Sequence, residues 1–366
     1  MKISISREEI LPALQTVNGV VERRQTLPIL SNVLLVISKD NISLTATDME
    51  VELVATIEKT SHKTGEITLP ARKLLDICKA LPEEAQINLE ISNDRASINS
   101  GKSRFVLSTL PAQEYPLVEF SEDKTHFQIS QRNFKNILDN TAFAMAQQDV
   151  RYYLNGLLLE LEGNKLRAVA TDGHRLALCD TEIESRPVKP IQVIVPRKGV
   201  TELTRLLRDD ERNVDVLISS NHIRLDLDGI KFTSKLVDGK FPDYTRVIPA
   251  ENDTPVVANK ELLRQSLTRA SILSNEKYRG VRIILEPSKL RALAHNPEQE
   301  EAEEEIEVTY SGNEMEIGFN VSYLLDALNI IKTENVFITI SDPNSSCLFL
   351  PENSKDCKFV VMPMRL

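Results

Sequence analysis

The segment Arg167-Ala-Val-Ala-Thr-Asp-Gly-His-Arg-Leu-Ala-Leu-Cys179 predicts the fold, because its central turn recurs along the chain. Thr171 and Asp172 lie between two strand-like runs, which is typical of a hairpin tip. The same Thr-Asp pair stands 124 residues earlier, and His295-Asn296 takes its place 124 residues later. A fixed spacing of this kind indicates a structural repeat.

Three further landmarks recur in the same order. Each unit opens with a polar start and apolar residues at helical spacing, at residues 5–14, 129–138 and 258–267. A second helix signal begins near Pro70, Pro196 and Phe319, and proline at or just before the first helical position suits the first two. Each unit closes with a basic-aromatic pair at intervals of 127 residues, Arg104-Phe105, Lys231-Phe232 and Lys358-Phe359. We therefore predict three α+β domains, 1–121, 122–250 and 251–366, each with two helices on antiparallel sheets.

The charge of the chain is unevenly distributed. A net charge of −10 taken alone argues against a partner as anionic as nucleic acid. The expected helices nevertheless carry a formal charge of +9, so that the rest of the chain carries −19. These helices are expected at residues 7–24, 72–82, 131–148, 197–208, 259–279 and 320–332. If they share one surface, that surface attracts a polyanion, although helices also accept Lys and Arg more readily than strands do.

Signatures of common enzymes are missing from the sequence. G-x-G-x-x-G, H-E-x-x-H and G-x-S-x-G do not occur, and the five histidines lack metal-ligand spacing, so we expect no cofactor and no metal. His174, in the Asp-Gly turn, leaves a Ser-His-Asp hydrolase open as an alternative to a plain tight turn.

The cysteines and the amino terminus suggest a cellular location. The four cysteines have no C-x-x-C spacing and predict reduced thiols. They are Cys78, Cys179, Cys347 and Cys357. The amino terminus turns polar too early for a signal peptide, and no apolar stretch approaches the roughly 18 residues of a membrane span. We therefore expect a cytoplasmic location and no membrane partner.

Several longer motifs carry a family resemblance. They are Gln148–Gly156, Ala170–Leu176, Val195–Val200, Ser234–Tyr244, Ile272–Gly280 and Val361–Leu366. With the threefold repeat, they resemble the bacterial DNA polymerase III beta subunit, the sliding clamp family, from end to end. The resemblance implies three repeated clamp domains and a head-to-tail homodimer that closes as a ring around double-stranded DNA. It also implies a processivity factor for replication and repair, which is not an enzyme.

The resemblance further implies positions near DNA. Contact with DNA must be electrostatic and undirected, since hydrogen bonds to base edges would fix a sliding ring at one sequence. The matching positions are Arg24, Arg72, Gln148, Tyr152, Tyr153 and Lys198.

A partner-peptide cleft between the second and third domains is implied in the same way. Its expected ligand is a short segment shared by the replicative polymerase catalytic subunit, the clamp loader and clamp-binding proteins of repair and translesion synthesis. The matching positions are Leu154, Thr171, Gly173, His174, Arg175, Leu176, Pro242, Arg246, Val247, Asn320, Tyr323, Ser346, Val360, Met362, Pro363, Met364 and Arg365. Leu, Val, Pro and Met make an adaptable apolar pocket suited to several ligands.

The acidic run Glu298–Glu307 is either a solvated face or part of an interface, and the resemblance implies the dimer interface. Like charges in a strand repel one another unless cations oppose them. By resemblance, basic residues of the first domain face these glutamates, while Phe105 and Leu107 pack against Ile272 and Leu273. The positions concerned are Lys73, Arg95, Lys102, Arg104, Phe105, Leu107, Ile272, Leu273, Glu300, Glu301, Glu303 and Glu304. An adaptor that gathers partners without DNA, and the hydrolase centred on His174, stay open as alternatives.

Overall fold

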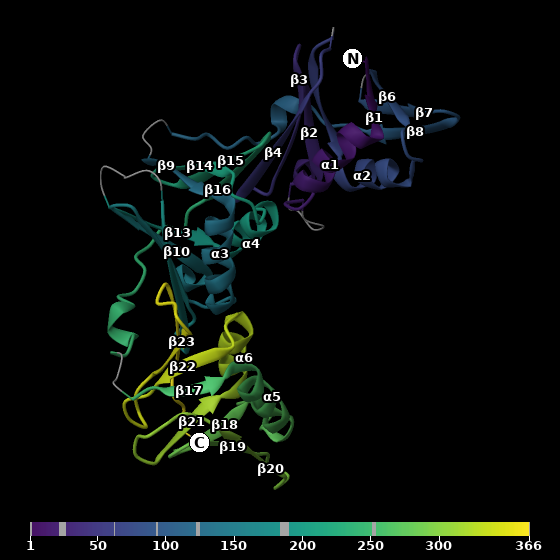
Figure 1. Ribbon diagram of the computed structural model, residues 1–366. Coiled ribbons are helices and arrows are strands. Elements are labelled where there is room, and N and C mark those ends of the chain that lie inside the picture. Colours follow the sequence, from purple (N-terminus) through teal and green to yellow (C-terminus); the bar gives the residue numbers. More distant parts are fainter. Residues whose placement is uncertain are drawn as a thin grey trace. The chain divides into compact units, whose positions relative to one another are not determined.

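The computed structural model describes residues 2–21, 27–61, 63–92, 94–121, 125–183, 190–250 and 254–365. The chain divides into two compact units (Figure 1). The first is built from Met1–Arg132 and Lys198–Leu236, and the second from Asn133–Ile183, Lys189–Arg197 and Val237–Leu366.

The first unit contains an eight-stranded and a four-stranded sheet, both antiparallel. The larger runs in the order β5-β2-β3-β4-β16-β15-β14-β9 and the smaller in the order β1-β6-β7-β8. The strands are β1 (Lys2–Ser6), β2 (Asn32–Ile37), β3 (Asn41–Thr47), β4 (Val51–Glu58), β5 (Gly65–Pro70), β6 (Gln86–Ser92), β7 (Arg95–Ser100), β8 (Ser103–Ser108), β9 (Thr125–Ser130), β14 (Asn213–Ile218), β15 (His222–Leu227) and β16 (Ile230–Lys235). The helices are α1 (Arg7–Val17), α2 (Ala71–Ala80) and most of α4 (Arg197–Leu206), with short 3₁₀ turns η1 (Pro28–Ser31) and η2 (Ala112–Glu114). Helix α1 packs on β3, β4 and α2.

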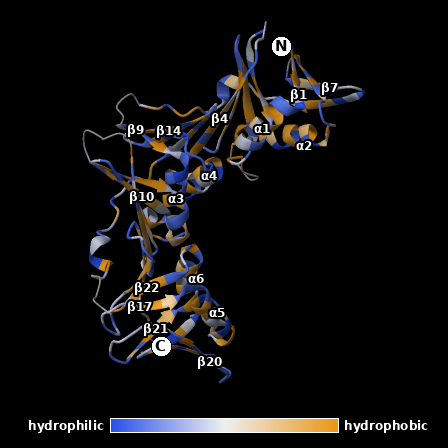
Figure 2. Ribbon diagram, viewed as in Figure 1, coloured by the Kyte–Doolittle hydropathy of each residue, from blue (hydrophilic) through white to orange (hydrophobic). Residues whose placement is uncertain are grey.

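The second unit has the same composition of sheets. The larger runs in the order β13-β10-β11-β12-β24-β23-β22-β17 and the smaller in the order β20-β19-β18-β21. The strands are β10 (Gly156–Glu162), β11 (Lys165–Thr171), β12 (Arg175–Glu182), β13 (Ile191–Pro196), β17 (Val256–Asn259), β18 (Gly280–Glu286), β19 (Lys289–His295), β20 (Glu301–Glu307), β21 (Met315–Asn320), β22 (Asn335–Thr339), β23 (Cys347–Pro351) and β24 (Cys357–Val361). The helices are most of α3 (Gln131–Thr141), α5 (Lys260–Ala270) and α6 (Val321–Ile330), with 3₁₀ turns η3 (Ala142–Ala144), η4 (Tyr152–Asn155), η5 (Thr245–Val247) and η6 (Ser271–Leu273). In Figure 2 the strands β10 and β22 are largely hydrophobic.

The element order repeats three times, which confirms the predicted architecture of two helices and antiparallel sheets per repeat. Each repeat supplies eight strands within the described ranges, β1–β8, β9–β16 and β17–β24, and two helices. Pro70 occupies the N-cap of α2, and Pro196 directly precedes α4, as expected. Asn259 and Asn320 cap α5 and α6 through their side chains.

The predicted helix ends were wrong, and this changes the charge argument. Helix α1 ends at Val17, α3 at Thr141 and α5 at Ala270, because the chain continues as a turn or a 3₁₀ segment rather than as further α-helix. Several cations counted above therefore lie outside helices. The six helices of the described residues carry a formal charge of +5, and not +9.

Each eight-stranded sheet joins two repeats through one strand pair, which we call a seam. In the first seam β4 pairs with β16, and Phe232 lies opposite Leu53. In the second seam β12 pairs with β24, and Phe359 lies opposite Ala177. Both phenylalanines come from the repeated basic-aromatic pair, and each opposes the residue five positions after the Asp of the Thr-Asp turn. The two seams therefore have the same register, and their phenylalanines are 0% and 1% exposed.

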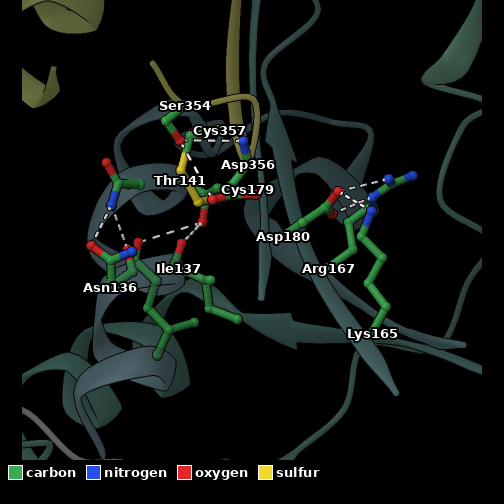
Figure 3. The surroundings of a disulfide bond; sticks show 12 residues. Asn136, Ile137, Thr141, Lys165, Arg167, Cys179, Asp180, Ser354, Asp356 and Cys357 are labelled. Carbon is green, nitrogen blue, oxygen red and sulfur yellow. Dashed lines mark hydrogen bonds and ion pairs between the residues drawn. A yellow bond between two sulfur atoms is a disulfide. The ribbon is translucent and has the colours of Figure 1, made fainter. Parts of the chain in front are cut away.

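The second seam carries a disulfide between Cys179 and Cys357 (Figure 3). The prediction of four reduced thiols was wrong for these two residues, because β12·β24 pairing brings together cysteines 178 residues apart. Cys78 and Cys347 are free, as predicted, and both are buried.

An ion pair between Glu9 of α1 and Lys59, which follows β4, predicts that the stability of the fold depends on pH. Ser6 and Glu9 form a capping box at α1, and Nζ of Lys59 lies 2.9 Å from Oε1 of Glu9. The Lys59 hydrogen bond, aided by the Ser6 backbone, lowers the pKa of Glu9 from 4.5 to about 2. A carboxyl whose pKa is depressed on folding stabilises the fold above its unfolded pKa and loses that contribution as pH falls.

We expect Glu9→Gln to lower the melting temperature by about 2 °C at neutral pH, because the amide keeps the cap but loses the charge. The difference from the parent protein should shrink as the pH falls from about 4.5 towards 2. Differential scanning calorimetry across this range measures it, with the exposed Glu114→Gln as a control that changes little. A difference independent of pH would contradict the assignment.

Candidate functional site

The repeated Thr-Asp turn is held by its own side chains. Oγ1 of Thr171 donates to the carbonyl oxygen of Arg175 at 2.6 Å and accepts from the N–H of Gly173. Oδ1 of Asp172 accepts from the N–H groups of His174 and Arg175, which closes an Asx turn. Gly173 has φ of +89°, which glycine adopts without the strain that other residues incur, and a Cβ there would lie 3.1 Å from Nη1 of Arg151.

The first repeat builds the same turn without the glycine. Thr47 bonds to the carbonyl oxygen of Val51, and Oδ1 of Asp48 accepts from the N–H groups of Glu50 and Val51. Met49 takes the left-handed conformation with φ of 75°. Both turns are hairpin tips, β3–β4 and β11–β12, as the sequence predicted.

The surroundings of His174 do not support the hydrolase alternative. Its imidazole stacks on Tyr323, with ring centroids 6.1 Å apart and an interplanar angle of 15°. Among the hydrogen bonds of the described residues, none joins the His174 ring to a serine or cysteine side chain. A catalytic triad requires a nucleophile within hydrogen-bond reach of its histidine. The described residues place none beside the His174 ring.

A cleft opens beside this turn, within the second unit. Its cavity volume is about 190 Å³. The lining residues come from η4, the β11–β12 turn, the segment around η5 and the carboxyl end of β24: Arg151, Tyr153, Leu154, Thr171, Gly173, Arg175, Leu176, Pro242, Asp243, Tyr244, Val247, Val360 and Met362. Leu154, Leu176, Tyr244 and Val360 continue into a buried apolar cluster below, so the floor of the cleft is rigid and its wall is mostly apolar.

Arg175 holds the polar side of the cleft. Its side chain is 14% exposed and pairs with both Asp172 and Asp326. Nη2 donates to the carbonyl oxygen of Phe143 at 2.9 Å, and the guanidinium lies 4.8 Å from the ring centroid of Tyr323. One side chain therefore ties the hairpin tip to α6 and to η3.

Tyr244 anchors the opposite wall through a second polar network. Its hydroxyl donates to Oε2 of Glu160 at 2.5 Å and accepts from Nη1 of Arg167 at 3.2 Å. Arg167 in turn pairs with Asp180, as does Lys165. Burial, with a further contribution from Glu160, raises the pKa of Tyr244 to about 12, so the phenol stays neutral at physiological pH.

Nine of the predicted cleft positions line the cavity together: Leu154, Thr171, Gly173, Arg175, Leu176, Pro242, Val247, Val360 and Met362. Others support its edges. Oγ of Ser346 donates to the carbonyl oxygen of Val247, Asn320 caps α6, and the N–H of Met364 donates to the carbonyl oxygen of Gly318. Arg246, by contrast, is 84% exposed and pairs with Asp243. Pro363 is half-buried and Arg365 exposed.

Sequence reasoning missed three lining residues and gave another a different role. Arg151, Asp243 and Tyr244 line the cavity but were not among the cleft positions, and Tyr153 was assigned to DNA. Asp243 and Tyr244 directly follow Pro242 in a motif already used for the resemblance, so that neighbourhood was the available signal.

The positions expected near DNA differ in their surroundings. Arg24 lies outside the described residues. Lys198 forms an ion pair with Asp48, and Nη2 of Arg72 donates to the carbonyl oxygen of Val21. Gln148 is exposed with φ of 55°. Tyr152 and Tyr153 form an edge-to-face pair with centroids 5.7 Å apart, and Tyr152 is the more exposed of the two.

The acidic strand β20 is partly neutralised within its own chain. Glu304 pairs with Arg269 of α5, Glu303 with Arg291 of β19, and Lys289 with Glu305. The other positions expected at a dimer interface are mainly exposed: Lys73, Arg95, Lys102, Arg104, Ile272, Glu300 and Glu301. Phe105 and Leu273 are half-buried, whereas Leu107 is buried in its own domain.

Neither a metal-binding cluster nor a membrane-spanning helix is found in the described ranges. These ranges hold no group of three His, Cys, Asp or Glu residues that could bind a metal ion. None of their helices has the length and apolar character needed to cross a bilayer.

Comparison with known proteins finds similarity along the whole chain. The N-terminal, central and C-terminal domains of the DNA polymerase III beta subunit family match residues 1–119, 128–243 and 245–365. The chain is 53% identical to a beta sliding clamp of Pseudomonas aeruginosa and 50% identical to one of Escherichia coli K12, with 100% of both chains covered in each case. A crystal structure of the Pseudomonas aeruginosa DNA polymerase sliding clamp with ligand superposes with a TM-score of 0.97, at 52% identity and full coverage of both chains.

The Arg175 network predicts a large cost for one substitution. Arg175→Ala should lower the free energy of unfolding by about 2–3 kcal/mol, because it leaves Asp172 without its buried cation and the Phe143 carbonyl without its donor. Arg246→Ala is the matched control and should cost less than about 0.5 kcal/mol, since that pair is exposed. Urea denaturation measures both, and equal losses would show that the network contributes little.

Proposed function

The chain belongs to the bacterial DNA polymerase III beta subunit family, and from this we propose how two copies join and where partners dock. It is a DNA sliding clamp, a processivity factor of DNA replication, and not an enzyme. DNA and a DNA polymerase are its partners, and a homodimeric ring of three-domain chains is the family's assembly.

The free sheet edges support a specific joint between the two copies. β4 and β12 each pair with the last strand of the next repeat, β16 and β24 respectively. Their third equivalent, β20, is an edge strand, and so is β8, the first-repeat equivalent of β16 and β24. An exposed edge is a template for another strand. We propose that β20 of one copy pairs with β8 of the other.

The register of this joint follows from the two seams within the chain. Leu53 and Ala177 each pair with the alanine directly before the Thr-Asp turn of their own hairpin, and in the third repeat the equivalent Ala294 pairs with Ala302. The register of the two seams would therefore place Phe105 opposite the partner's Ala302. Arg104 would then oppose the partner's Glu303 on the outer face of the sheet. This pairing brings a cation of β8 to the acidic strand, and opposite charges across strands stabilise the pair.

The burial of the repeated aromatic residues supports the same joint. Phe232 and Phe359 are fully buried by their seams, whereas Phe105 is only half-buried. In the second seam Phe143 of η3 packs against Phe359, with centroids 6.1 Å apart. Its equivalent in the third repeat is Ile272, which is 75% exposed. Ile272 would therefore cover the partner's Phe105, which makes this contact the apolar centre of the joint.

A head-to-tail joint closes as a ring or continues as a filament, and cross-linking distinguishes the two. Cys357 and Cys179 of the second seam correspond to Ser103 and Glu304 at the joint. We expect Ser103→Cys combined with Glu304→Cys to form disulfides between chains under mild oxidation. A non-reducing denaturing gel should show one product of two chains. Arg104→Cys with Glu304→Cys places the thiols out of register and is the control.

The Ser103→Cys and Glu304→Cys variant also tests whether the clamp encircles DNA. The main structural support for this role is that β20 and β8 are edge strands at equivalent positions of their repeats. The clamp should be loaded on nicked circular DNA with the clamp loader of a related bacterium and then oxidised. We expect retention in high salt on circles and loss after linearisation, because only a topological link slides off free ends. A ladder of cross-linked species, no cross-link, or equal release from both DNA forms would contradict the ring; an adaptor independent of DNA would be retained on neither.

Weak, non-specific electrostatic attraction between the clamp and DNA suits a ring that must slide along the duplex. The helices of the described residues carry a formal charge of only +5, and several of their cations are paired, including Arg205 with Glu202 and Arg264 with Glu261. Modest charge allows sliding, since enclosure rather than affinity keeps the protein on DNA. Our proposed DNA-facing positions remain the exposed Tyr152 and Gln148, together with Tyr153, Arg72, Lys198 and Arg24.

We propose that the cleft beside Arg175 binds the short peptide segment by which the polymerase catalytic subunit, the clamp loader and proteins of repair and translesion synthesis dock. The apolar wall with Met362 and the rigid floor support this use. A cytoplasmic location, where bacterial DNA is replicated, belongs to the same proposal.

The cleft proposal predicts a local effect of charge. Met362→Asp should weaken binding of a fluorescent peptide that carries a family clamp-binding motif by at least about tenfold, because a carboxylate would be desolvated in an apolar pocket. Leu117→Asp, at an exposed apolar residue of the first unit, should leave the affinity unchanged. Fluorescence anisotropy measures both, and equal affinities for the two variants would place the peptide elsewhere.

A further inference from the structure

The disulfide occupies a particular position in the second seam. Cys179 lies on β12 directly opposite Cys357, the first residue of β24. The N–H of Asp180 donates to the carbonyl oxygen of Asp356 at 2.8 Å. The adjacent cysteine pair is therefore at a non-hydrogen-bonded site, where side chains of antiparallel strands approach most closely (Figure 3).

The seam does not need this bond to form. At the equivalent position of the first seam Ile230 lies opposite Ala55, with the same register and no sulfur. Backbone pairing and apolar packing suffice there. The Cys179–Cys357 bond is therefore not needed for β12 and β24 to pair, and its role is distinct from that of the strand pairing.

Both cysteines are buried, but only Cys357 adjoins an exposed turn. Cys179 is 0% exposed, and Cys357 is 8% exposed and follows the turn that contains the exposed residues Asn353 and Lys355. Cys78 and Cys347 are buried without a partner, and desolvation raises the pKa of both thiols. Of the four cysteines, Cys179 and Cys357 are the pair that closes a bond, and the exposed turn just before Cys357 is the side from which a small reagent would reach it.

We propose that Cys179 and Cys357 form a reversible redox staple that joins the second and third repeats, set by exchange with low-molecular-weight disulfides. The thiolate of Cys357 attacks one sulfur of the small disulfide and releases one small thiol, which leaves a mixed disulfide. Cys179, after loss of its proton, attacks the Cys357 sulfur and releases the second small thiol. The two protein thiols are oxidised, and one small disulfide is reduced to two thiols. Reduction runs the same steps backwards.

The staple acts on the strands that carry the cleft. Leu176 lies opposite Val360 in the same β12·β24 pair, three residues from the disulfide, and both line the cavity. With the bond closed, β12 and β24 cannot separate at that end. With the bond open, the seam relies on its backbone ladder, as the first seam does. This role goes beyond the clamp function and does not depend on DNA or on a peptide.

Thiol counting on the full-length protein tests the exchange. The protein is equilibrated with buffers that range from reduced to oxidised glutathione, quenched in acid, unfolded, and labelled with a maleimide mass tag. We expect four tags in reducing buffer and two in oxidising buffer, with peptide mapping that places the remaining tags on Cys78 and Cys347. Four tags throughout the range, or two tags even under strong reduction, would overturn a reversible staple.

Thermal unfolding tests the mechanical role. We expect the oxidised protein to melt about 5 °C or more above the reduced protein, because the cross-link restricts the unfolded chain. Cys179→Ala combined with Cys357→Ile copies the Ala55 and Ile230 pair of the first seam and should remove the redox dependence. The comparison of the two redox states of the parent protein stands even if this variant does not fold. Equal melting temperatures in the two states would overturn the proposal.

Discussion

Backbone pairing between consecutive repeats is the constraint on which this structure depends. Peptide N–H and C=O groups at the edge of a sheet must find partners or remain exposed to any other strand. β4·β16 and β12·β24 meet this requirement in the same register, so each repeat is related to the next by the same local contact. The Phe232 and Phe359 side chains are buried by that contact, and one wall of the cleft is made by it.

Features encoded by nearby residues could be predicted from the sequence. The Thr-Asp turn is stabilised by hydrogen bonds of its own hydroxyl and carboxylate groups. The positions of Asp172 and Asp48 therefore predicted hairpin tips from sequence alone. Pro70 and Pro196 marked helix starts for a similar reason, because proline suits the beginning of a helix whatever lies around it. The repeat and the fold class followed from these signals and from the family resemblance, and the resemblance alone supplied nine of the residues that line the cavity.

Features that depend on distant partners could not be predicted in this way. Cys179 and Cys357 are unremarkable in sequence, and only the register of two strands makes them neighbours. Lys198 was counted in the formal helix charge, yet its ammonium forms an ion pair with Asp48 from another repeat. Helix ends were overestimated because apolar spacing continued past Thr141 into a 3₁₀ turn that sequence periodicity does not distinguish from α-helix.

Because both seams have the same register, the contact between repeats does not depend on whether the repeats belong to one polypeptide chain. Each seam is made by backbone groups and a repeated phenylalanine, and neither requires that its two strands belong to one gene product. A clamp encoded as separate fragments, or as one fused gene with more repeats, would use the same contacts. The number of chains in such an assembly is then a matter of genetic history, while the number of repeats is set by how much each seam turns one repeat relative to the next.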